Sequence, residues 1–136
     1  MTLERIASAF DYLLARFGIP VTYRRFKGVS YDPDTGTQKE FWETTTFRAI
    51  VYSASTRETP ISGGVISDAE AVLAFRQDVF TQQPDEPERP SPKLGDEIEF
   101  HGQRWTPAEV SRRPVLREDP TKTLFFLGVK RDQGRD

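Results

Sequence analysis

The sequence predicts a mostly β protein: a small antiparallel β-barrel or sandwich of about six strands with one N-terminal amphipathic α-helix. Two patterns predict this class. Apolar residues recur at three- and four-residue steps up to residue 17, and the period changes to two after Pro20. The chain has 136 residues, a usual length for one domain, so residues 1–136 are predicted to form a single domain.

The N-terminal helix is predicted over residues 2–17. Gly18 then follows as a typical residue after a helix end, and Pro20 prevents the helix from continuing. The apolar side chains fall on one face, which we expect to pack against the sheet. These side chains are Leu3, Ile6, Phe10, Leu13, Leu14 and Phe17.

The β region is predicted over residues 20–131. Its first strand begins at Val21, where apolar and polar residues start to alternate. The segment 31–36, with the sequence YDPDTG, is dense in turn residues, and strand-forming residues resume over 39–52. A long hairpin is therefore predicted in the first half of the chain.

Shorter strands follow in the second half. Residues 70–76 are predicted to form a buried strand. His101 and Gly102 are typical of a two-residue hairpin turn, and residues 123–130 are predicted as the last strand. The charged tail, 132–136, is expected to fray.

Two long loops interrupt the β region. The first, 53–66, contains Gly63 and Gly64, which permit large changes of backbone conformation. The second, 81–93, carries four prolines among acidic residues, so we expect it to be extended and exposed. Loops of this length in a compact domain usually have a function or lack order, although long surface insertions are also tolerated.

Composition excludes several kinds of protein. The chain has no cysteine, so disulfides, thiolate metal sites and cysteine nucleophiles are excluded. The formal net charge is −2, whereas proteins that hold duplex DNA by counterion release carry a basic excess. No apolar run is long enough to span a bilayer, and charged residues interrupt the N-terminal segment where a signal peptide would be apolar.

The polar residues offer no complete catalytic or metal-binding set. His101 is the only histidine, and its position in a turn suits neither a ligand set nor a catalytic triad. Asp32, Asp34 and Glu43 match three positions of a calcium loop, but the fifth and sixth positions are wrong. Asp96 adjoins a turn and is expected to be solvated. We therefore predict no metal, no cofactor and no enzymatic activity.

The order of several short motifs is more informative than any one of them. In chain order they are 17–25 (FGIPVTYRR), 31–36 (YDPDTG), 49–52 (AIVY), 94–98 (LGDEI), 100–105 (FHGQRW) and the terminal strand 124–129 (LFFLGV). This order resembles the small head-closure, or stopper, proteins in the neck of tailed bacteriophages, also called head–tail connector or head–tail joining proteins. The resemblance covers most of the chain, from about residue 10 to residue 131.

The resemblance implies a barrel-like protein that forms a homo-oligomeric ring in the neck of the virion. Portal and adaptor proteins would lie above this ring and tail proteins below it. Packaged DNA would pass nearby without specific binding, and the ring would lie in no membrane. Assembly would take place in the cytoplasm of the host bacterium. The family resemblance implies no cofactor and no reaction.

In this setting the two long loops become candidate contact regions. We expect the first loop to reach either the channel axis or a neighbouring subunit, and the second to present an outer or tail-facing surface. The candidate residues of the first loop are Ile61, Gly63, Gly64 and Val65. Those of the second loop are Asp85, Glu86 and Glu88.

Other functions remain open at the level of sequence. The many aromatic residues are compatible with a barrel that stacks single-stranded nucleic acid, and a basic stripe beside them would favour that function. A pocket of polar groups around His101 would favour a small hydrolase or carbohydrate-acting domain. Another neck or tail completion protein of a phage is a third alternative.

Overall fold

The structure is a computed structural model that describes residues 3–53, 60–61, 65–66, 69–84 and 86–132. The helix and the longer strands are α1 (Leu3–Phe17), β1 (Ile19–Asp32), β2 (Thr37–Ser53), β5 (Ala71–Arg76), β6 (Glu97–Phe100), β7 (Gln103–Pro107) and β11 (Leu124–Arg131). The shorter elements are β3 (Pro60–Ile61), β4 (Val65–Ile66), the 3-10 turn η1 (Gln77–Val79), β8 (Glu109–Val110), β9 (Arg113–Pro114) and β10 (Leu116–Glu118). The protein is mostly β with one N-terminal helix, as predicted.

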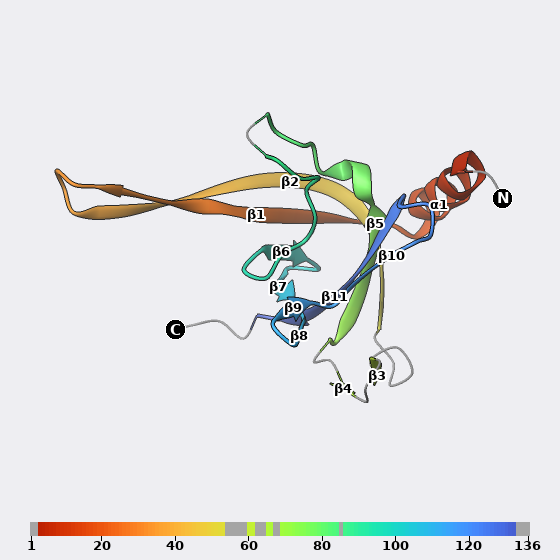
Figure 1. The fold of residues 1–136 in the computed structure, drawn as a ribbon. Helices are drawn as coiled ribbons and strands as arrows, with labels where there is room; N and C mark the ends of the chain where they lie inside the picture. The colour runs from red at the N-terminus through yellow and green to blue at the C-terminus, as the bar shows by residue number, and fades with distance from the viewer. Residues whose placement is uncertain (1–2, 54–59, 62–64, 67–68, 85, 133–136) are drawn as a thin grey trace.

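The main sheet closes into a small antiparallel barrel (Figure 1). Its strand order is β11-β5-β2-β1-β6-β7, and β7 then pairs back onto β11 through Val129 and Pro107. β10 is a further strand of this sheet and pairs with residues 125–127 of β11. Closure removes most free strand edges from the barrel, which limits unwanted pairing with other chains.

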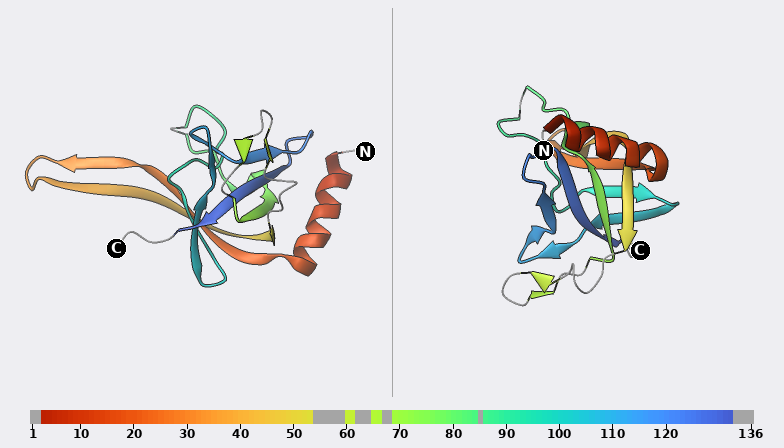
Figure 2. Two further views of the ribbon diagram at one scale, coloured as in Figure 1. Left: turned by 90° about the horizontal axis from the view of Figure 1, so that it is seen from below. Right: turned by 90° about the vertical axis from the view of Figure 1, so that its right-hand side faces the viewer.

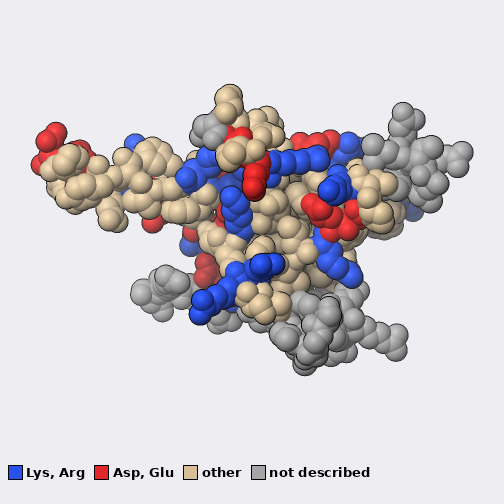
Figure 3. All heavy atoms as spheres, viewed as in Figure 1, with Lys and Arg blue, Asp and Glu red and all other residues tan. Residues whose placement is uncertain are grey.

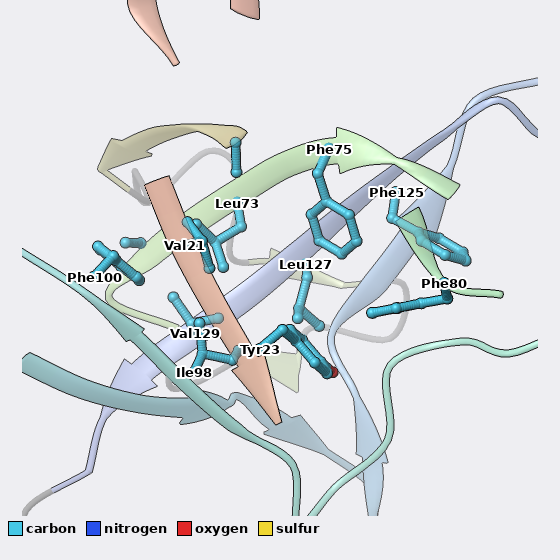
Figure 4. Close-up of a cluster of buried hydrophobic side chains, with 12 residues drawn as sticks. Val21, Tyr23, Leu73, Phe75, Phe80, Ile98, Phe100, Phe125, Leu127 and Val129 are labelled. Carbon is cyan, nitrogen blue, oxygen red and sulfur yellow. The ribbon is translucent and has the colours of Figure 1, made fainter. Parts of the chain in front are cut away.

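The main core fills the inside of this barrel (Figure 4). Tyr23, Phe75, Phe125 and Leu127 are fully or almost fully buried there. Successive side chains of a strand point to opposite faces of the sheet, so every second side chain of these strands points into the barrel. Each large apolar side chain buried in this way contributes about 1.5–3 kcal/mol of transfer free energy.

A second, smaller cluster lies on the outside of the sheet, where α1 packs (Figure 2). Phe10 of the helix is buried against Ala74 of β5 and Leu124 of β11. β5 and β11 are therefore apolar on both faces, one facing the barrel interior and the other the helix. This explains the unbroken apolar runs of these two strands in the sequence.

The expected apolar face of α1 is only partly covered. Leu14 packs against the outer cluster, but the side chain of Leu13 is 41% exposed and that of Phe17 is 60% exposed. The prediction that Leu13 and Phe17 belong to the core is therefore wrong. They lie at the edge of the apolar stripe, and the helix rests on the sheet through Phe10 and Leu14 instead.

Gly18 ends the helix for a steric reason. Its N–H donates to the carbonyl oxygen of Leu14 at 2.8 Å. A Cβ atom at residue 18 would lie 2.4 Å from that same oxygen, so a larger residue would displace the backbone. The glycine is required by this close approach.

The predicted turns and the central strand are confirmed. Residues 31–36 form the tip of the β1–β2 hairpin, and the predicted strand at 70–76 is β5. His101 and Gly102 both have positive φ, 52° and 69°, between the paired residues Phe100 and Gln103. This is the backbone that a two-residue hairpin turn requires.

The loops and the tail contain more structure than expected. The segment 53–66 includes the short β3–β4 ribbon, in which Ile61 pairs with Val65. The segment 81–93 has no strand, but Pro90 and Pro92 are buried, so the expectation of a fully exposed loop is wrong. Asp132, the first residue of the tail, donates its N–H to Arg104 O at 3.0 Å. Residues 133–136 lie outside the described residues.

Candidate functional site: a projecting arm and its anchor

A two-stranded arm extends from the barrel on the side opposite α1 (Figure 1). We define the arm as residues 25–44, the outer part of the β1–β2 hairpin. In the part of the chain that is described, β1 pairs with β6 over Thr22–Arg24, and β2 pairs with β5 from Ile50 onward. Beyond Arg24 of β1, the two strands of the arm pair only with each other, and no third strand lies beside them.

One face of the arm carries an apolar stripe. Phe26 pairs with Trp42, and their rings pack edge to face with 5.1 Å between the ring centroids. Val29 and Tyr31 follow on the same face by the strand register, and their partners on β2 there are Glu40 and Gln38, so the apolar stripe runs along the β1 side of this face. The side chains of Phe26, Val29 and Tyr31 are 40%, 53% and 61% exposed, respectively. Apolar side chains gathered on one side of a projecting ribbon are typical of an interaction surface.

A β-bulge lies where the arm leaves the barrel. The register shifts between Phe26, which pairs with Trp42, and Gly28, which pairs with Phe41. Gly28 has a φ of +142°, which side chains rarely tolerate. The extra residue in the bulge is Lys27, whose ammonium group reaches the acidic loop beside the arm.

Four charged residues join the base of the arm to that loop. We call Arg25, Lys27, Glu43 and Glu86 the anchor. The Arg25 guanidinium donates to Glu43 at 2.7 Å and to Glu86 at 3.1 Å, and Lys27 Nζ donates to Glu86 at 2.6 Å. The Arg25 side chain is only 9% exposed. Its guanidinium carbon lies 5.3 Å from the centroid of the Phe80 ring. Removing one partner of such a buried pair leaves a charge without compensation.

The charges of the anchor support one another. Hydrogen bonds from Lys27 and Arg25 lower the pKa of Glu86 below its usual value. Burial would lower the pKa of Arg25, but the hydrogen bond and the charge of Glu86, together with Glu43, raise it. Arg25 and Glu86 are therefore both charged at neutral pH, and their contact ties the proline-rich loop to the arm.

Asp96 forms a second connection beneath the anchor. It is 3% exposed, so the expectation that it would be solvated is wrong. Its carboxylate accepts from the Tyr23 hydroxyl at 2.6 Å, from Lys93 N at 2.9 Å and from Phe26 N at 3.2 Å. Asp96 therefore links the core, the end of the loop and the start of the arm.

Burial is the largest influence on the pKa of both Asp96 and Tyr23. It raises the pKa of Asp96, against the opposing effect of the three hydrogen bonds. Burial, and then the neighbouring Asp96, raise the pKa of Tyr23 well above its usual value, so the phenol keeps its proton and donates. The pair has the geometry of a structural link, since the Tyr23 ring packs against Phe80 at 4.9 Å inside the core.

The candidate loop residues have different positions. The backbones of Ile61 and Val65 pair in the β3–β4 ribbon, whereas Gly63, Gly64 and Asp85 lie outside the described residues. Glu86 belongs to the anchor and faces the arm. Glu88 is exposed, as a surface role would require.

The structure separates the residues considered for metal binding. Asp32 and Asp34 lie at the arm tip, where Asp34 N donates to Asp32, while Glu43 lies at its base beside Arg25. Across the described ranges, no three histidine or acidic side chains gather as a metal site would require. His101 is an exposed hairpin residue whose ring contacts Phe100. The helix in the described structure falls short of the length and apolarity of a membrane span.

Sequence reasoning missed the arm and Asp96. Phe26 and Val29 are three residues apart, so a period of two would place them on opposite faces, and only the bulge at Lys27 brings them onto one face. A period of two also does not show whether a face is covered by the barrel. Asp96 looked like an ordinary turn residue. Its burial depends on the loop folding over it, which no local pattern reports.

Comparison with known proteins assigns no family. Neither protein-family models nor curated protein sequences give a significant match to this chain.

Proposed function

We propose that the protein is a structural component of a bacteriophage neck, where a ring of copies closes the DNA-filled head and joins it to the tail. Such a protein acts by contact with neighbouring subunits and needs no reaction. The order of sequence motifs supports this proposal, and so does the barrel with its helix.

The observation that carries the proposal is the projecting arm. A two-stranded ribbon is marginally stable by itself in water, yet here it presents Phe26, Val29 and Tyr31 to solvent. The anchor and the bulge hold its base in one direction. An element that is rigid at its base and apolar along one face is well suited to contact another protein in an assembly.

The charge pattern argues against the single-stranded nucleic-acid alternative. Arg24 lies 4.6 Å over the Trp42 ring, as in a stacking site, but its guanidinium is held by Glu97 at 2.5 Å. Glu99 lies two residues further along the same face of β6. Basic and acidic groups therefore alternate beside the aromatic rings, and Figure 3 shows Lys and Arg interspersed with Asp and Glu over the viewed face. A nucleic-acid groove would need an excess of basic groups there.

The test is to mix the purified chain with the portal–adaptor complex of its phage and to image the product by electron microscopy. We expect added ring density below the adaptor. The matched variant shortens the arm by replacing residues 30–39 with Asn-Gly, since Val29 and Glu40 are already paired and a two-residue turn fits between them. The control variant is Glu118→Ala, at an exposed position in β10 outside the arm and the candidate loops.

Three results decide between the candidate functions. Density below the adaptor with wild type and Glu118→Ala, and its loss with the shortened arm, supports the proposal. Density at the tail end instead would assign the protein to tail completion. No added density, together with tight and salt-sensitive binding of single-stranded DNA, would overturn the neck assignment in favour of nucleic-acid binding.

A further inference from the structure

We infer that the apolar face of the arm docks on the exposed face of α1 of a second copy of this chain. The inference rests on the proposed function, because it names the two surfaces through which the ring would form. It is argued from the exposed side chains at the two ends of the molecule and from the charges beside them.

The arm cannot cover its own apolar stripe. About eight residues of β1 extend past the pairing with β6, which at about 3.3 Å per residue places the tip roughly 25 Å away from the barrel wall. Phe26, Val29 and Tyr31 are exposed along this length. No other described part of the chain covers these side chains, which leaves them available to another molecule.

A second exposed apolar surface lies on α1, which we call the helix patch. Its centre is Leu13 and Phe17, one turn apart and 41% and 60% exposed, and Tyr12, 63% exposed, adjoins them through Arg16, which contacts both Tyr12 and Phe17. Figure 1 shows the arm and α1 at opposite ends of the molecule. Two different surfaces at opposite ends form head-to-tail contacts, which close into rings when the rotation between subunits allows.

Charge complementarity favours this pairing over contact between two arms. The tip of the arm carries Asp32 and Asp34, and Figure 3 shows acidic atoms at its end. Beside the helix patch, Arg16 donates to the Tyr12 hydroxyl at 3.3 Å and lies 5.7 Å from the Phe17 ring. Among the ion pairs of the described residues, none involves Arg16. Two arms packed side by side in parallel would instead bring their acidic tips together.

The chain has no cysteine, so disulfide trapping can test the contact directly. One protein carries Tyr31→Cys and a second, of different tag length, carries Leu13→Cys. Both sites are exposed, so both variants are expected to fold, and circular dichroism checks this. The matched control replaces Leu13→Cys with His101→Cys, an exposed position far from the helix patch along the chain.

We call the disulfide-linked dimer of Tyr31→Cys with Leu13→Cys the 31–13 product, and that of Tyr31→Cys with His101→Cys the 31–101 product. Under mild oxidation at high protein concentration, we expect the yield of the 31–13 product to exceed that of the 31–101 product several-fold. Asp34→Lys in the arm protein should reduce this excess, and Arg16→Glu in the other protein should restore it. Equal yields of the two products, or a dominant 31–31 product, would overturn the inference.

This result is independent of the neck experiment. Trapping uses the isolated chain, so a specific 31–13 product without neck density would leave the contact standing and remove the proposed function. Neck density without the 31–13 product would support the proposed function and overturn the contact between the arm and α1.

Discussion

The Tyr23 hydroxyl donates a hydrogen bond of 2.6 Å to the Asp96 carboxylate across 73 residues of chain. The same carboxylate accepts from the backbone of Lys93 and Phe26. One buried acid therefore joins the barrel core to the loop and to the first residues of the arm. Because the arm projects from this point, its direction depends on contacts that are far apart in the sequence.

The link between Tyr23 and Asp96 should be energetically coupled. Asp96→Ala leaves one buried and two partly buried donors without their acceptor and should reduce the free energy of unfolding by ~1–3 kcal/mol. Tyr23→Phe removes one donor and should cost about 1 kcal/mol. The double variant should cost less than the two single changes added together, as measured by urea unfolding. Strict additivity would contradict the coupling.

The anchor should weaken in acid. The folded state lowers the pKa of Glu86, so its contribution to stability is present above the unfolded value of about 4.3 and is lost as the pH falls below it. Glu86→Gln should therefore melt below wild type at neutral pH, and this difference should shrink as the pH falls from 5 to 3. Glu88→Gln, in the same loop but exposed, is the control. A difference that does not change with pH would show that the charge of Glu86 is not the cause.

Two helix residues that look alike in the sequence should behave differently. Phe10 is 7% exposed, and Phe10→Ala should cost roughly 3 kcal/mol or more by removing contacts with the outer cluster. Leu13 is 41% exposed, and Leu13→Ala should change the stability by no more than about 0.5–1 kcal/mol. Chemical denaturation measures both. Similar losses for the two variants would mean that α1 packs through a wider face.

The bulge at the base of the arm should depend on Gly28. A Cβ atom there meets nothing within 4 Å, so the effect of Gly28→Ala comes from the φ of +142° and should be roughly 1–3 kcal/mol of local strain. Hydrogen exchange should become faster at arm amides while barrel amides stay protected. Ser30→Ala, also in the arm, is the control. Unchanged exchange in the arm after Gly28→Ala would contradict this reading of the bulge.

Local patterns were sufficient for the helix, the long strands and the tight turns, but not for the short strands β3, β4, β8, β9 and β10. The apolar spacing up to Phe17, together with Gly18 and Pro20, predicted the helix to within one residue of its observed start. The turn at 31–36 and the His101–Gly102 hairpin were predicted from residues whose backbone preferences act over two to four positions. Such signals need no knowledge of distant parts of the chain.

Burial was harder to predict, because it depends on which surfaces meet. Leu13 and Phe10 share the apolar stripe of α1, but the sheet covers only Phe10. Glu86 was expected on an outer surface, and it pairs instead with Arg25 and Lys27, which lie some sixty residues earlier in the chain. No spacing rule connects these positions.

The sequence by itself determined the helix, the turns and the mostly β character, because each follows from short-range periodicity and backbone preference. Only the tertiary structure decided that the barrel closes through β7 and β11, that Asp96 is buried, and that the outer half of the first hairpin stands free. Strand alternation states that a face is apolar and not what covers it. That choice is made when strands distant in the chain pair, and here their pairing ends at Arg24 and begins again at Ile50, leaving the arm uncovered between them.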